Sequence, residues 1–164
     1  MIRDLGPDDL AAWRRIRAEG LRLFPDAFLT TLQEELARSD EEVAESLAGR
    51  LVLGAFDGDW LIGTAALDSV VEAAAAAHRV ALNAFYVSTE SHGTGIGTRL
   101  LRAALGRAAT DGKLQVELFV AAHNAPAIRL YEKHGFVRHG LLPRAARLED
   151  GFVDDLYYVR QLDG

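Results

Sequence analysis

Three glycines alternate with other residues at Gly93, Gly95 and Gly97, just before a leucine-rich run. Glycine adopts positive φ and lets a backbone come close to a ligand. A loop of this kind ahead of a helix exposes unpaired backbone N–H groups, and the helix dipole adds partial positive charge. The spacing predicts either a phosphate or pyrophosphate site or a tight turn that binds nothing.

Two common phosphate loops fit this stretch poorly. A Walker loop needs lysine after its last glycine, but Gly97 is followed by Thr98. A dinucleotide fingerprint needs a third glycine, which is replaced by Thr98 counting from Gly93 and by Leu100 counting from Gly95. The Walker loop is therefore excluded, and a dinucleotide site is disfavoured.

A second block of interest runs from Asn124 to Phe136. Asn124 is a good N-cap, and Gly135 suits the position just past a helix end. In such an ending Phe136 packs back near Tyr131 and fixes the tyrosine ring. The alternative is a helix with an ordinary buried aromatic residue.

Together the stretches 85-FYVSTESHGTGIGTRLL-101 and 118-LFVAAHNAPAIRLYEKHGF-136 resemble the two core motifs of the GNAT (Gcn5-related) N-acetyltransferase family. The first resembles its strand, pyrophosphate loop and helix, and the second its Asn…Ala…Leu-Tyr-Glu-Lys-x-Gly-Phe motif. The resemblance implies acetyl-CoA as co-substrate, no metal, and direct acetyl transfer to a primary amine of a small molecule, peptide or protein. The alternative function is a non-catalytic acyl-CoA-binding module of the same fold.

The resemblance also implies site residues. His92 departs from the family pattern, which usually has Gln or Arg there. Tyr131 is implied to protonate the departing thiolate, in addition to touching the cofactor. The implied cofactor-binding residues are Phe85, Tyr86, Val87, His92, Gly93, Thr94, Gly95, Ile96, Gly97, Thr98, Asn124 and Tyr131.

No general base stands out. Glu117 is the best-placed carboxylate and is paired with Tyr131 as the predicted catalytic set, although Glu117 could equally be an exposed strand residue. His123 and Glu35 are weaker candidates. A water chain could serve instead, or the amine could arrive deprotonated.

These residues need a scaffold, which the apolar patterns outline. The expected elements, in chain order, are a strand at 2–5, a helix from Asp8 to about Leu23, a helix near 31–48, a hairpin at 51–69 turning at Asp57-Gly58, a loop at 73–77, a strand at 79–89, a helix from 96 to Gly112, a strand at 114–120, a helix from Asn124 to Gly135, and a hairpin at 136–162 turning at Asp150-Gly151.

This order predicts an α/β (α+β) fold, and the family resemblance implies that residues 1–164 form a single N-acetyltransferase domain. Its sheet is central, mixed and mostly antiparallel, with about six to seven strands flanked by helices. The family resemblance implies that the strands near 79–89 and 114–120 splay apart, with a bulge in the first. The family resemblance also implies that the acceptor site is bounded by residues at about 20–40 and 141–155.

The charge and composition of the chain limit the kinds of partner that we expect. The chain of 164 residues has a formal net charge of −6, which argues against nucleic-acid binding. It has no cysteine, which fits a cytoplasmic protein, and no apolar run long enough to span a membrane. A homodimer is one assembly that we consider.

Overall fold

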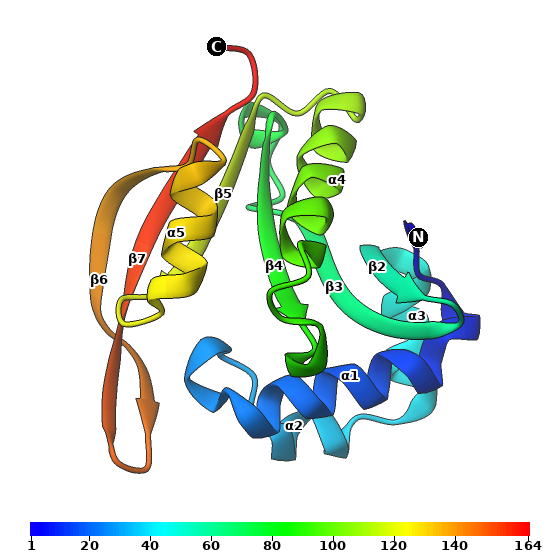
Figure 1. Ribbon diagram of the computed structural model, residues 1–164. Coiled ribbons are helices and arrows are strands. Elements are labelled where there is room, and N and C mark those ends of the chain that lie inside the picture. Colours follow the sequence, from blue (N-terminus) through cyan, green and yellow to red (C-terminus); the bar gives the residue numbers. More distant parts are fainter.

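A seven-stranded mixed sheet runs through the computed structural model, which describes residues 1–164 (Figure 1). Its strand order is β1-β2-β3-β4-β5-β7-β6, and every neighbouring pair is antiparallel except β4 and β5. This confirms the predicted mixed, mostly antiparallel sheet. The strands are β1 (Ile2–Asp4), β2 (Leu51–Asp57), β3 (Trp60–Ser69), β4 (Arg79–Val87), β5 (Gln115–Ala121), β6 (Val137–Leu148) and β7 (Gly151–Gln161).

Helices cover both faces of the sheet. Helices α4 and α5 lie in front of it in Figure 1 and bury one core cluster, whereas α1 and α3 bury a second cluster on the other face. No helix combines the length and the apolar character needed to cross a bilayer. The helices are α1 (Leu10–Leu23), α2 (Leu32–Ala37), α3 (Asp40–Gly49), α4 (Ile96–Thr110) and α5 (Ala125–Lys133).

The predicted single helix near 31–48 is wrong, because the chain forms α2 and α3 with a break between them. Each helix has its own capping box. The Thr31 hydroxyl accepts the Glu34 N–H, and the Glu34 carboxylate accepts the Thr31 N–H; Ser39 and Glu42 repeat the arrangement. Ser39 is extended rather than helical, so its cap starts a new helix instead of continuing the old one.

The start of α1 also differs from the prediction. Asp8 does not cap the helix, because Pro7–Asp9 forms a separate short 3₁₀ turn before it. The Asp9 carboxylate instead accepts the Gly6 N–H at 2.9 Å and forms an ion pair with Arg3 at 2.8 Å. Asp9, rather than Asp8, therefore makes the polar side-chain contacts just before α1.

Both predicted hairpins are confirmed, with each turn displaced by one residue. Strands β2 and β3 are joined by Gly58-Asp59, and Gly58 has a φ of +55°. Strands β6 and β7 are joined by Glu149-Asp150. Within the stretch predicted as a loop at 73–77, Ala74–Ala76 forms one short 3₁₀ turn.

Strands β4 and β5 splay apart as predicted. Their parallel pairing covers only Arg79–Ala81 against Gln115–Glu117, although β4 continues to Val87 and β5 to Ala121. A bulge in β4 accompanies the opening, with Ala84 at a φ of +48°. Such a bulge bends a strand and leaves backbone groups outside the ladder. The two strands therefore open a gap beyond their third pair of residues.

Candidate functional site

A cavity of about 630 Å³ lies at this gap. Its lining residues are drawn from four segments, at 24–28, 85–87, 91–97 and 121–130. They belong to the α1–α2 connection, the end of β4, the glycine loop before α4, and the passage from β5 into α5. The splay thus brings together the two sequence motifs and part of the predicted acceptor region.

The glycine loop presents an uninterrupted set of hydrogen-bond donors. The backbone N–H groups of residues 93–98 have no acceptor within the protein. Gly93 and Gly95 have φ values of +76° and +84°, which L-residues with side chains seldom adopt. Because α4 begins at Ile96, its N-terminal dipole adds partial positive charge here. This arrangement fits an anion such as a pyrophosphate.

Not every loop residue faces the cavity. Gly93, Gly95, Ile96 and Gly97 line it, but Thr94 and Thr98 do not. The backbone N–H groups of Thr94 and Thr98 are unpaired like those of their neighbours, but the cavity lining includes neither residue.

His92 is bound back onto β4. Its Nε2 lies 2.8 Å from the Val87 carbonyl oxygen, which can only accept, so this nitrogen carries the proton. The ring is exposed at the cavity wall, 6.4 Å from the Phe24 ring centroid. The imidazole thus ties the start of the loop to the end of the strand.

The predicted β4 residues Phe85, Tyr86 and Val87 all line the cavity. The Tyr86 hydroxyl donates to Glu19 at 2.8 Å, and Ser88 donates to the same carboxylate at 2.7 Å. Burial raises the pKa of the Tyr86 phenol, and the hydrogen bond to Glu19 raises it further. Tyr86 is therefore a protonated donor that fixes this part of β4 to α1.

Glu19 was not among the predicted site residues. Burial acts to raise its pKa, but hydrogen bonds from Ser88 and Tyr86 outweigh burial and leave that pKa below its usual value. One signal was available in the sequence: Glu19 lies three residues after the buried Ile16, on the inward-facing stripe of α1. A carboxylate on such a stripe needs donors from a neighbouring element.

The second motif folds as predicted. The Asn124 side chain caps α5 by accepting the Ala127 N–H at 3.3 Å, and Asn124 also lines the cavity. At the other end, Phe136 N–H bonds to the Tyr131 carbonyl at 3.1 Å, and Gly135 has a φ of +84°. This is a Schellman ending. The Phe136 and Tyr131 ring centroids are 5.6 Å apart, edge to face.

Tyr131 lies beside the cavity without lining it. Its side chain is buried, and its ring meets that of Phe85, a cavity-lining residue, at 6.0 Å. Burial raises the pKa of the phenol, so it stays protonated near neutral pH. The hydroxyl has no hydrogen-bond partner within the protein, so its proton is not committed to another side chain.

Glu117 is neither an exposed strand residue nor a cavity residue. Its carboxylate accepts from Arg79 at 2.5 and 2.8 Å, from Tyr157 at 2.8 Å and from Gln115 at 2.8 Å. The Arg79 hydrogen bonds are the main cause that lowers its pKa to about 2, against an opposing effect of burial. So weak a base suits an anchor between strands rather than proton exchange near neutral pH.

The two weaker base candidates, His123 and Glu35, differ in whether they line the cavity. His123 lines the cavity, and its Nε2 lies 2.5 Å from Asp26 Oδ2. Glu35 is buried outside the cavity, 3.5 Å from Arg38. Of the two regions expected to bound the acceptor, 20–40 supplies lining residues from 24 to 28, whereas 141–155 supplies none.

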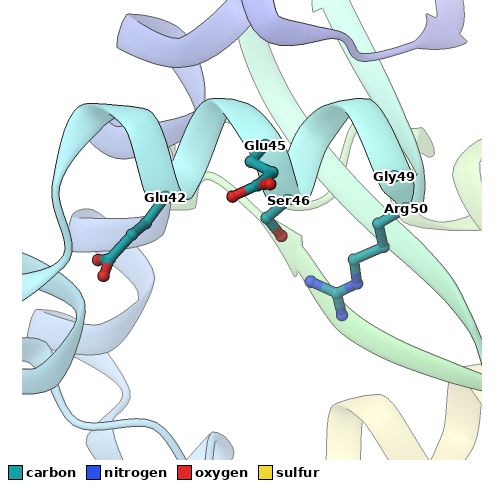
Figure 2. Close-up of a pocket in the computed structure, with 5 residues that line it drawn as sticks. All are labelled: Glu42, Glu45, Ser46, Gly49 and Arg50. Atoms are coloured by element: carbon teal, nitrogen blue, oxygen red, sulfur yellow. The ribbon is translucent and has the colours of Figure 1, made fainter.

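A second hollow, of about 430 Å³, lies along α3 (Figure 2). It is lined by exposed or half-buried polar residues and glycine, and its one cation, Arg50, is paired with Asp68 at 2.5 Å. None of the motif residues lies there. We therefore place the functional site at the splay of β4 and β5.

Comparisons with known proteins agree with this fold. The sequence model of the acetyltransferase (GNAT) family matches residues 13–136. The L-amino acid N-acetyltransferase AaaT of Escherichia coli is 30% identical over 167 residues, covering 98% of this chain and 96% of that protein. YncA of Salmonella typhimurium, solved with acetyl-CoA, has a TM-score of 0.85 at 23% identity, covering 100% of this chain and 94% of that one.

Mycothiol acetyltransferase of Sanguibacter keddieii is 33% identical over 146 residues, which are 88% of this chain and 45% of that protein. The chain spans about half the length of two of the curated relatives that it matches. The structure and these matches define an acetyltransferase fold. The chain belongs to the acetyltransferase (GNAT) family.

Proposed function

We propose that the protein is an acetyl-CoA-dependent N-acetyltransferase that moves an acetyl group directly to a primary amine of a small molecule or peptide. The observation that carries this proposal is the unbroken set of unpaired N–H groups at residues 93–98, beside a cavity between splayed strands. Membership of the GNAT family supports the same reaction class.

Three parts of the chain would hold the co-substrate. The backbone at 93–98 would bind the pyrophosphate, Phe85–Val87 would contact the pantetheine arm, and Asn124 would lie near its thioester end. Acetyl-CoA, when bound, supplies the acetyl group as an activated thioester. Tyr131, which holds its proton at the phenol oxygen, is the donor that we propose for the leaving sulfur.

The cavity also suggests what kind of amine is accepted. Near the α1–α2 connection it is lined by the aromatic rings of Phe24 and Phe28 and by the carboxylate of Asp26, and it has no lysine or arginine. The relatives named above carry different acceptors in their names, L-amino acids and mycothiol, so we argue from the cavity. An amine with an apolar body and no carboxylate suits this lining, because a carboxylate would find no cation.

The proposal is tested by thiol release from acetyl-CoA with four acceptors: 2-phenylethylamine, spermidine, L-methionine and a hexapeptide that starts with alanine. We expect turnover of at least one, with 2-phenylethylamine above L-methionine. Binding of CoA without acetylation of any amine would favour the non-catalytic module instead.

The loop assignment has its own test in Gly95→Asp. A side chain and a negative charge at a φ of +84° would enter the anion cradle, so the Kd for CoA should rise at least about 100-fold. Gly112→Asp is the matched control, since Gly112 has a φ of +76° and lies at the far end of α4. Equal CoA affinity in the two variants, measured by calorimetry, would refute the assignment.

Two further expectations stay predictions. A homodimer is tested by the molecular mass in solution, and a cytoplasmic location by cell fractionation.

A further inference from the structure

Few groups in the cavity could take a proton from the acceptor. An amine must present a neutral nitrogen to react and must lose a proton as the amide forms. The titratable side chains that line the cavity are Asp26, Tyr86, His92 and His123. Glu117, whose pKa lies at about 2, is not among them.

Two of these four groups have other tasks. Tyr86 donates its proton to Glu19, and burial raises the pKa of its phenol, so it is not a base near neutral pH. His92 donates Nε2–H to the Val87 carbonyl and belongs to the loop that we assign to the pyrophosphate. The pair formed by Asp26 and His123 remains.

This pair has the arrangement of a base with its orienting carboxylate. The Nε2 atom of His123 lies 2.5 Å from Asp26 Oδ2, and an ionised carboxylate can only accept, so Nε2 carries the proton. In the neutral ring Nδ1 then keeps its lone pair, and Nδ1 has no hydrogen bond within the protein. When Nδ1 accepts a second proton, Asp26 stabilises the resulting cation.

The pair also lies where an acceptor would meet it. His123 comes two residues after the end of β5, and Asp26 is in the short 3₁₀ turn Pro25–Ala27 of the α1–α2 connection. The contact therefore bridges two walls of the cavity. The side chains of His123 and Asp26 are 59% and 35% exposed, so a proton taken from the amine can pass on to water.

We propose that His123 is the base that accepts the proton of the acceptor amine, and that Asp26 is a positioning residue that orients its ring. This rests on the proposed acetyl transfer. As the bond between the amine nitrogen and the acetyl carbon forms, the carbon–sulfur bond breaks. The surplus N–H proton goes to Nδ1 of His123, and the sulfur takes a proton from Tyr131. Water then removes the proton from His123 and returns one to Tyr131, which balances the reaction.

Two other carboxylates lie on the strand beside His123. Strand β7 pairs with the end of β5, where Asp155 lies opposite Ala121 and the Asp154 carbonyl accepts the Ala122 N–H. Burial raises the pKa of Asp155, and the neighbouring Asp154 raises it further. Asp26 is the only carboxylate that forms a hydrogen bond with the His123 ring, so Asp26 is the residue that the test replaces.

The test compares His123→Gln and Asp26→Asn with His139→Gln, an exposed histidine on β6, using the best of the four acceptors above. In His123→Gln, kcat should fall about 100- to 1,000-fold at neutral pH with the Kd for CoA within about twofold of wild type. The loss should shrink as pH rises toward the pKa of the free amine. In Asp26→Asn, kcat should also fall, with the Kd for CoA within about twofold of wild type, because the His123 ring loses the carboxylate that orients it.

A readout without turnover uses the ¹⁵N resonances of the imidazole rings. We expect His123 to be the Nε2–H tautomer in the wild type and to hold that tautomer less strongly in Asp26→Asn, whereas His139→Gln leaves the His123 signals in place. A wild-type kcat and pH profile in His123→Gln, with amines still acetylated, would overturn this inference and leave the proposed function intact. A wild-type protein that acetylates none of the four amines would overturn both.

Discussion

At the scale of single residues, the surroundings of the Tyr131 phenol restrict its chemistry. It is enclosed by Phe85 and Phe136, it has no hydrogen-bond partner in the protein, and burial raises its pKa. A phenol held in this way can donate a proton but contributes little charge to cofactor binding. Its role is therefore separable from affinity.

We expect Tyr131→Phe to lower kcat about 100-fold and to leave the Kd for CoA unchanged, because the ring packing stays and only the proton is lost. Rapid-mixing assays of thiol release measure the first quantity, and calorimetry the second. Tyr158→Phe is the matched control, since Tyr158 is also buried but donates to Glu132. Equal turnover in Tyr131→Phe and Tyr158→Phe would leave Tyr131 with packing alone.

Residues governed by local rules could be predicted from the sequence. Gly95 and Gly135 need positive φ, and Asn124 caps the helix that follows it, so each position follows from its neighbours in the chain. Glu117 could not be understood in this way. Its main partner, Arg79, lies on another strand, 38 residues away in the chain, and spacing does not reveal a contact made by strand pairing.

At the scale of elements, the Arg79–Glu117 ion pair spans the short pairing of β4 and β5, from Arg79 in the first residue pair to Glu117 in the last pair before the splay. The lowered pKa of Glu117 makes this contact depend on pH. A group with a depressed folded pKa contributes stability that is full above its unfolded pKa, about 4.3, and is lost as pH falls toward its folded pKa, here about 2.

Glu117→Gln should therefore lower the free energy of unfolding by about 2 kcal/mol at neutral pH, because a charge-assisted hydrogen bond is lost. The difference from wild type should narrow as pH falls from about 4.5 toward 2. Urea unfolding at several pH values measures both effects. The control Glu45→Gln, at an exposed position on α3, should show neither effect. If the free energies of unfolding of Glu117→Gln and wild type differed by the same amount across that pH range, the role of the Glu117 charge would be contradicted.

Element types were easier to predict than element ends. The apolar pattern near 31–48 is continuous enough to suggest one helix, yet Ser39 and Glu42 form a capping box that outweighs it. Ser39-x-x-Glu42 is visible in the sequence, so the signal was present. The hairpin turns shifted by one residue because strand pairing, not the favoured Asp-Gly pairs, sets the register.

At the scale of the whole molecule, the sheet consists of two parts that share only three residue pairs, Arg79–Ala81 with Gln115–Glu117. The strand order around that seam could not be obtained from patterning alone, because β7 comes last in the chain yet lies between β5 and β6. The family resemblance implied that β4 and β5 splay apart, and the structure confirms that they do. The site lies at the seam, so both parts of the sheet contribute to it.

The donors at residues 93–98 have a practical consequence for anyone measuring this protein. Backbone amides recognise oxyanions by charge and shape, so we expect sulfate and inorganic pyrophosphate to bind in the same cradle. An affinity for CoA measured in phosphate buffer is then a competition value, weaker than one measured in a buffer of bulky organic ions. Titrating sulfate against CoA should raise the apparent Kd linearly, and a Kd that ignores sulfate would mean that the cradle is closed to small anions.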